Sequence, residues 1–214
     1  RGAISLWRDG AITPIIPEIA GEADGRFNDV IAAPGGRVFC GTMPTDAHDG
    51  RLYRLDPDGT LTTLLEGVTV SNGLGFTPDR RGVYHTDSMK KTITLFDFDE
   101  ATGAIANGRI FKDLNDEPGV PDGMTVDAEG YIWSARWDGS VLVRYAPDGG
   151  EVQRITFPAL KVSSAVFGGD DYGDLYVTTA GGHDKATNGP GAGALYRLRP
   201  GVRGVPEFRS NVTA

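Results

Sequence analysis

The sequence predicts an all-β protein built from a repeated unit of short strands. Apolar stretches recur in one phase along the chain, and their aromatic centres are 45, 49 and 43 residues apart, at Phe39, Tyr84, Trp133 and Tyr176. Turn-forming sequences separate the stretches, and 31 glycines suit a chain with many turns. Because a unit of roughly 45 residues with several short strands is typical of a propeller blade, we predict a β-propeller.

Each unit contains strands in a regular order. The predicted central strands are Arg37–Gly41, Gly82–Thr86, Tyr131–Ala135 and Asp174–Thr178. A second strand follows each of them, at Arg51–Asp56, Thr92–Asp97, Val141–Tyr145 and Ala194–Leu198, and Ala3–Trp7 has the same character. Third strands are predicted at Ala11–Ile16, Leu61–Leu65 and Glu151–Phe157. The alternative is a β-sandwich, but a sandwich has no reason to repeat in phase.

The acidic residues near these strands are interpreted first as turn residues. Asp and Gly are common in tight turns because Asp can accept hydrogen bonds from nearby backbone and Gly allows unusual dihedral angles. This interpretation covers Asp56, Asp58, Asp97, Asp99 and Asp148.

The number of repeats is smaller than a large closed ring needs. The 214 residues hold about four and a half blades, and the chain begins in the middle of one. A propeller leaves no strand edge exposed only when its ring of blades closes. We therefore expect residues 1–214 to form a single domain that lacks an N-terminal blade and part of the next. A closed five-bladed ring is the alternative.

Composition excludes several kinds of partner. The net charge of −8 argues against nucleic acid and anionic membranes, which attract basic surfaces. The sequence has no apolar run of about 20 residues, the length of a membrane span. The single cysteine, Cys40, excludes an internal disulfide, fits a cytoplasmic location and lies in an apolar run typical of core. The sequence does not indicate the oligomeric state.

Polar residues recur at the start of a further short strand in each repeat. Asn28, Asn72, Asp122 and Ser164 are separated by 44, 50 and 42 residues, each just before an apolar segment. The first strand of every propeller blade lines the central axis, so these residues should converge there. Amide and carboxylate oxygens are ligands of Ca²⁺, Mg²⁺ or Mn²⁺. The pattern therefore predicts a metal site.

Simpler interpretations of these residues exist. Asn72-Gly73 and Asp122-Gly123 are common turn dipeptides, and either one alone would favour a turn. The occurrence of three such residues in one phase, Asn28, Asn72 and Asp122, favours a shared site. The histidines at 48, 85 and 183 share neither phase nor metal-ligand spacing, which argues against a histidine metal site or a catalytic triad.

Several motifs in order resemble those of the gluconolactonase and senescence-marker-protein (regucalcin) family, along nearly the whole chain. They are Arg26-Phe27-Asn28-Asp29 with Gly41-Thr42-Met43, Ser71-Asn72-Gly73-Leu74 with Thr86-Asp87-Ser88, Pro121-Asp122-Gly123-Met124 with Asp127-Ala128-Glu129-Gly130, Phe167-Gly168-Gly169 with Leu175-Tyr176-Val177-Thr178-Thr179, and Gly201-Val202-Arg203-Gly204. The chain departs from the family at Val30 and Ala33, where the family prefers Gly and Asp.

The resemblance implies a six-bladed propeller with a divalent cation held by a Glu, an Asn and an Asp. It assigns the metal ligands to Asn72 and Asp122, and substrate binding to Arg26, Asn28 and Asp46. Nothing in the chain matches the Glu. Calcium is the first choice of ion, with Zn²⁺, Mg²⁺ and Mn²⁺ as alternatives.

The expected activity is metal-dependent hydrolysis of a sugar lactone, with Asp122 as general base on water. One alternative is a related propeller hydrolase that acts on organophosphates or other esters. The other is a non-enzymatic propeller that binds calcium, which the phase-matched acid Asp122 argues against.

Overall fold

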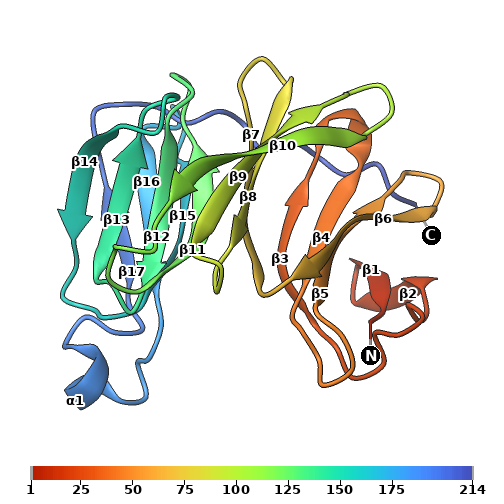
Figure 1. The fold of residues 1–214 in the computed structure, drawn as a ribbon, viewed down its shortest axis with the longest axis horizontal. Helices are drawn as coiled ribbons and strands as arrows, with labels where there is room; N and C mark the ends of the chain where they lie inside the picture. Colours follow the sequence, from red (N-terminus) through yellow and green to blue (C-terminus); the bar gives the residue numbers. More distant parts are fainter. Residues whose placement is uncertain (1, 214) are drawn as a thin grey trace. The chain divides into compact units, whose positions relative to one another are not determined.

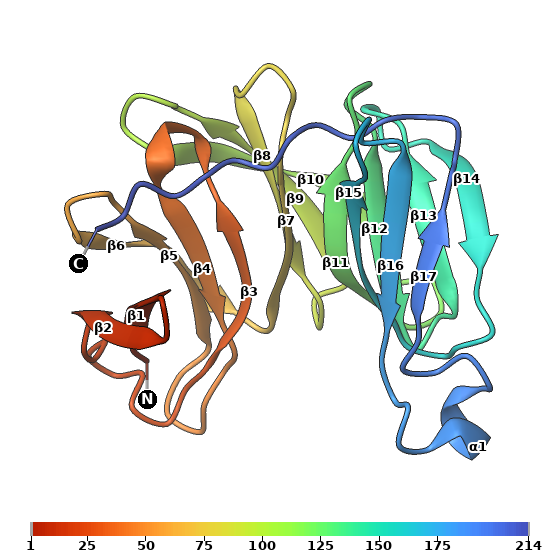
Figure 2. The ribbon, with the colours of Figure 1, turned by 180° about the vertical axis from the view of Figure 1, so that it is seen from behind.

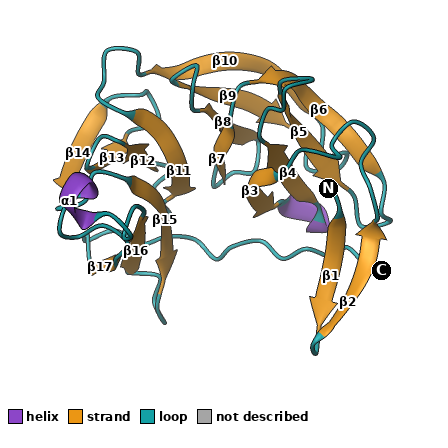
Figure 3. Ribbon diagram, turned by 90° about the horizontal axis from the view of Figure 1, so that it is seen from below, coloured by secondary structure: helices purple, strands orange, loops and turns teal. Residues whose placement is uncertain are grey.

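The computed structural model describes residues 2–213, and nearly all of the regular structure in them is β-strand (Figure 1). Five sheets contain strands β1 to β17, and every strand pair with a defined register is antiparallel. Figure 3 shows how little helix accompanies them: the 3-10 turn η1 (Pro34–Gly36) and the single helical turn α1 (Lys185–Asn188). No helix in the described part of the chain is long and apolar enough to cross a membrane.

The described residues form two compact units. The first comprises residues 2–71, 99–105 and 207–213 and contains two sheets. One is the hairpin of β1 (Ile4–Arg8) and β2 (Ala11–Ile16). The other is a four-stranded meander of β3 (Phe27–Ala32), β4 (Val38–Thr42), β5 (Gly50–Leu55) and β6 (Leu61–Val68).

The second unit comprises residues 72–98 and 106–206 and contains nearly all of three further sheets. Their strands are β7 (Ser71–Phe76), β8 (Gly82–Asp87), β9 (Thr92–Phe98) and β10 (Ile105–Asp113); β11 (Val120–Val126), β12 (Ile132–Trp137), β13 (Val141–Tyr145) and β14 (Glu151–Thr156); and β15 (Val162–Gly168), β16 (Asp174–Thr179) and β17 (Leu195–Leu198). Figure 2 shows β15, β16 and β17 side by side.

In each of these sheets neighbouring strands follow one another along the chain, which is the topology of a propeller blade. The predicted central strands are confirmed as β4, β8, β12 and β16, and the predicted second strands as β5, β9, β13 and β17, with no end shifted by more than two residues. Each predicted polar entry segment is the first strand of its sheet, at β3, β7, β11 and β15. The β-propeller class is therefore confirmed.

Strand β12 shows why the sheets of the second unit pack together. Ile132 belongs to the core between the β7–β10 and β11–β14 sheets, whereas Trp133 and Ala135 belong to the core that includes Val162 and Phe167 of β15. Successive side chains of a strand point to opposite faces, so a strand with buried apolar side chains on both faces joins two cores. Each fully buried large apolar side chain stabilises the fold by about 1.5–3 kcal/mol.

The first unit has its own core, which contains Cys40. Cys40 is buried with Ile19 and Tyr53, and Ile4 and Phe27 pack against the same cluster. Burial raises the pKa of the Cys40 thiol to about 12, so the side chain is a neutral core group at physiological pH. The interpretation of Cys40 as core filler is confirmed.

Most of the predicted turn aspartates cap turns. Asp58, Asp99 and Asp148 each accept a hydrogen bond from a backbone N–H two or three residues later. In the Asp56–Gly59 turn, Gly59 has a φ of 85°, which a residue with a β-carbon rarely adopts.

The turn interpretation is wrong for Asp97. It lies within β9, where its carboxylate accepts hydrogen bonds from Asn107 and Arg109 on the exposed surface. The prediction placed the end of this strand one residue too early.

A buried carboxylate organises the turn that joins β11 to β12. Asp127 is fully buried and accepts hydrogen bonds from Trp133 Nε1 at 3.0 Å, from Arg144 Nε at 2.9 Å and from the backbone N–H groups of Glu129 and Tyr131. Because a buried charge is stable only when its partners are complete, this network accounts for the Asp127-Ala128-Glu129-Gly130 motif as a structural element.

Candidate metal site

The two predicted metal ligands lie at the same end of neighbouring first strands. Asn72 is the second residue of β7, and Asp122 is the third residue of β11. Both side chains are partly buried. Gly73 and Gly123 lie inside the strands and are absent from the glycines with positive φ. The turn interpretation is therefore wrong for both dipeptides.

Glycine at position 73 allows the two strands to approach closely. A methyl group on Gly73 would lie 2.6 Å from the Asp122 carbonyl oxygen and 2.9 Å from Thr86 Oγ1. These distances are shorter than any real contact of a β-carbon, so only glycine fits. Gly123 has the corresponding position toward β15, where a methyl group would lie 2.9 Å from the Ser163 carbonyl oxygen.

The strand ladder is interrupted where the polar residues stand. The register of β11 with β12 shifts between Pro121 and Met124, which flank Asp122. The register of β3 with β4 shifts between Phe27 and Val30, which flank Asn28. Such irregularities redirect side chains and are frequent beside active sites. The repeated phase in the sequence therefore corresponds to a repeated interruption of the ladder.

Ser88 links Asn72 to Pro121, the residue before Asp122, and the sequence analysis did not select it. Asn72 Nδ2 donates to Ser88 Oγ at 3.0 Å, and Ser88 Oγ donates to the Pro121 carbonyl oxygen at 2.7 Å. Ser88 is 3% exposed. It follows β8 directly, and an antiparallel strand that pairs with β7 must end beside the start of β7. The expected pairing of these two strands is the signal in the sequence that could have identified Ser88.

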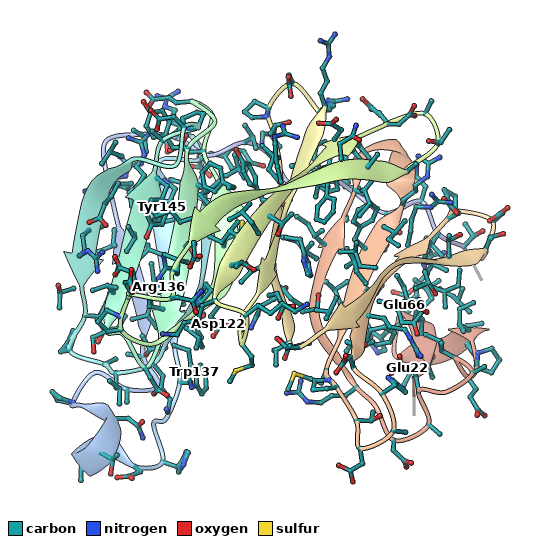
Figure 4. The ribbon with its side chains drawn as sticks, in the orientation of Figure 1. Glu22, Glu66, Asp122, Arg136, Trp137 and Tyr145 are labelled. Atoms are coloured by element: carbon teal, nitrogen blue, oxygen red, sulfur yellow. The ribbon has the colours of Figure 1, made fainter. Side chains whose placement is uncertain are left out.

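A buried arginine lies one strand away from Asp122. Arg136 of β12, labelled in Figure 4, pairs in register with Pro121. Its side chain is fully buried. Its guanidinium donates to Ser134 Oγ at 2.6 Å and to Tyr145 Oη at 2.7 Å, and within the described residues its Nε has no partner. Desolvation lowers the pKa of Arg136 and raises that of Tyr145. Sequence reasoning missed both residues, because an arginine in a strand pattern resembles an exposed one.

The predicted substrate-binding residues Arg26 and Asn28 are in direct contact. The exposed Arg26 guanidinium donates to Asn28 Oδ1 at 3.1 Å, and Asn28 Nδ2 donates to the Ser71 carbonyl oxygen at 3.0 Å. These contacts hold Asn28 at the start of β3 and leave most of Arg26 in solvent.

Asp46 lies in the loop between β4 and β5. Its exposed side chain lines a cavity of about 520 Å³ together with Asp24 and Thr45. His48 tethers this loop, because its two ring nitrogens lie 2.6 Å from the carbonyl oxygens of Gly21 and Asp49. Carbonyl oxygens only accept, so this geometry favours the doubly protonated ring, and these hydrogen bonds raise the pKa of His48.

Asn72 and Asp122 supply one amide and one carboxylate of the kind that hard divalent cations prefer. Among residues 2–213, no cluster of three or more His, Cys, Asp or Glu side chains could hold a metal ion. An amide oxygen and a carboxylate fit a hard divalent cation and leave its other coordination positions to further ligands.

Comparisons with known proteins agree with this fold. Residues 1–181 match the family described as the SMP-30/gluconolactonase/LRE-like region. The pentonolactonase of Haloferax volcanii is 52% identical over 194 residues, which cover 87% of this chain and 67% of that protein. A solved luciferin-regenerating enzyme is similar over 98% of this chain and 75% of its own, with a TM-score of 0.89 and 29% identity.

A third similar protein is described as calcium-binding. It is the regucalcin of Agrobacterium tumefaciens, whose crystal structure has a TM-score of 0.85 and 29% identity over 94% of this chain and 70% of that one. The extent of the family match, the identity to the pentonolactonase and the blade topology together establish the family of this chain. The chain belongs to the SMP-30/gluconolactonase/LRE-like family of β-propeller lactonases.

Proposed function

We propose that this protein is a divalent-metal-dependent lactonase that opens the ring of a sugar lactone. The observation that carries the proposal is the link from Asn72 through Ser88 to Pro121, which holds an amide beside the strand that bears Asp122. The similarity to a pentonolactonase supports a five-carbon sugar lactone as the first substrate to test.

Asn72 Oδ1 and an oxygen of Asp122 would hold the cation. When bound, the ion would polarise the lactone carbonyl and stabilise the negative charge that develops on its oxygen. Calcium is the first ion to test because a similar protein is described as calcium-binding. Mg²⁺, Mn²⁺ and Zn²⁺ are the alternatives.

Asp122 would also act as the general base. A carboxylate has two oxygens, so one can face the cation while the other accepts a proton from the water that attacks the lactone carbonyl. As the bond between the carbonyl carbon and the ring oxygen breaks, the protonated Asp122 would return its proton to that oxygen, which gives the ring-opened hydroxy acid and restores the Asp122 carboxylate. Arg26, Asn28 and Asp46 are proposed to bind the sugar hydroxyl groups, for which guanidinium, amide and carboxylate groups are suitable partners.

A panel of sugar lactones assayed by proton release tests the proposal. The protein is treated with a chelator, dialysed, and assayed before and after single ions are added back. We expect hydrolysis of five-carbon lactones to fall to background after chelation and to return with at least one divalent ion. Hydrolysis at full rate in the chelated protein would contradict metal dependence, and no hydrolysis of any lactone with any ion would contradict the activity.

A further inference from the structure

The hydrogen bonds of Ser88 determine which way the Asn72 amide points. A serine hydroxyl has one hydrogen, and the Pro121 carbonyl oxygen 2.7 Å away can only accept it. Toward Asn72, 3.0 Å away, Ser88 Oγ must therefore act as the acceptor. Asn72 consequently presents its NH₂ group to Ser88, and Oδ1 remains the outward end of the amide. If the amide were turned by 180°, Asn72 Oδ1 would face Ser88 Oγ, and neither oxygen would have a hydrogen to donate to the other.

We propose that Ser88 is a positioning residue of the metal site, which makes Asn72 Oδ1 the ligand oxygen. The inference rests on the proposed function, because it assigns a role toward the same ion. Ser88 also joins the end of β8 to the residue before Asp122, so one hydroxyl sets both the direction of the Asn72 amide and the spacing between the two ligand-bearing strands. Residues that orient metal ligands in this way commonly change metal affinity by about 10–100-fold when replaced.

Burial makes the hydroxyl difficult to replace by water. Ser88 is 3% exposed, and Pro121 beside it is buried. After Ser88→Ala the Asn72 NH₂ group loses its acceptor and the Pro121 carbonyl loses its donor. The amide can then rotate, and an orientation that points NH₂ toward a cation repels it. The loss should therefore appear in metal affinity itself, and not only in stability.

Calorimetric titration of the metal-stripped protein with calcium chloride tests the inference. We expect Ser88→Ala to raise the Kd for calcium by about 10–100-fold relative to the unaltered protein. Ser88→Cys, which keeps a similar side chain with a weak donor and acceptor, should raise the Kd less. If Ser88→Ala does not fold, as judged by circular dichroism, Ser88→Cys carries the test in the same direction.

Thr77→Ala is the matched control. The Thr77 hydroxyl donates to Asp79 at 2.6 Å and accepts from the Gly82 N–H at 2.9 Å, at the opposite end of the same pair of strands. Its removal should lower the melting temperature by an amount similar to Ser88→Ala and leave the Kd for calcium unchanged. Equal losses of affinity in both variants would show that Ser88 acts only through general stability, and would overturn the inference.

A second measurement needs no metal. In the metal-free protein, the side-chain NH₂ resonances of Asn72 should be distinct in two-dimensional NMR spectra and should move toward random-coil positions in Ser88→Ala. Unchanged resonances would overturn the inference even if the Kd rose. If the unaltered protein binds no divalent ion, the proposed function is wrong, and the inference that rests on it is wrong as well. If it binds calcium and Ser88→Ala binds equally well, the inference alone fails.

Discussion

Asn72 and Asp122 are held in a different way from Arg26, Asn28 and Asp46. The first pair stands on strands that glycine allows to approach closely, and a buried hydroxyl joins them. The second group lies in the other unit, with Arg26 and Asp46 exposed to solvent. A metal site tolerates little error in ligand position, whereas an exposed side chain can adjust when a substrate binds. We therefore expect the side chains of Asn72 and Asp122 to be more rigid than those of Arg26 and Asp46 before any ligand binds.

The largest expected effect comes from Asp122→Asn. The variant keeps the shape of the side chain but removes its negative charge and its basicity. We expect kcat for lactone hydrolysis to fall by about 10²–10⁴-fold, the usual range for loss of a general base, with an unchanged circular dichroism spectrum. Asp148→Asn, in an exposed turn of the same sheet, is the control and should retain normal activity. A kcat within tenfold of normal in Asp122→Asn would remove Asp122 from the mechanism.

Gly73→Ala tests whether the strand approach holds the metal pair together. The added methyl group meets the Asp122 carbonyl oxygen, which is backbone and cannot move aside alone. We expect a loss of about 1–3 kcal/mol in the free energy of unfolding, measured in urea, together with weaker metal binding. Gly150→Ala is the control, because its nearest neighbour is the flexible Asp148 carboxylate. Normal stability and metal binding in Gly73→Ala would contradict the proposed rigidity.

Asn28→Ala should have a smaller effect. It removes the acceptor of Arg26 and the donor to the Ser71 carbonyl oxygen, and each hydrogen bond contributes about 0.5–1.5 kcal/mol. We therefore expect kcat/KM to fall by about 2–10-fold, with the Kd for calcium unchanged. A loss as large as that of Asp122→Asn would place Asn28 in the catalytic machinery itself, and the distinction between the two groups would disappear.

Two histidines, one in each unit, should titrate in opposite directions. Burial lowers the pKa of His85 on β8 to about 4, whereas hydrogen bonds to two carbonyl oxygens raise the pKa of His48 above 6.5. For His85 the unfolded chain binds the proton more tightly, so stability is complete above about pH 6.5 and is lost as the pH falls toward 4. For His48 the contribution is complete below pH 6.5 and is lost as the pH rises through its raised pKa. NMR titration of the two rings tests this, and His48→Gln should remove only the loss at higher pH.

The fold was largely predictable because strand patterns and turn chemistry act locally. Apolar stretches with recurring aromatic centres placed β4, β8, β12 and β16 within two residues of their observed bounds, and Asp58-Gly59 specified its turn. Asp97 was misjudged because a strand end has no sharp local signal.

The candidate site was predictable only in part. Asn72 and Asp122 could be selected because the same phase recurs in each repeat, and a repeat places equivalent residues at equivalent points. Asn28 shares that phase, but its assignment to substrate binding, like those of Arg26 and Asp46, depended on the family resemblance, and this role stays a prediction.

The sequence by itself determined the class of fold and named a candidate pair of oxygen donors, because periodicity and residue type can be recognised along the chain. Only the tertiary structure decided that Gly73 and Gly123 are points of strand contact and not turns, and that Ser88 stands between Asn72 and Pro121. It also revealed that Arg136 is buried against Tyr145. The longest of these contacts, between Gly73 and Asp122, joins residues 49 positions apart, and a hydrogen bond or a steric overlap over that separation exists only once the strands have packed.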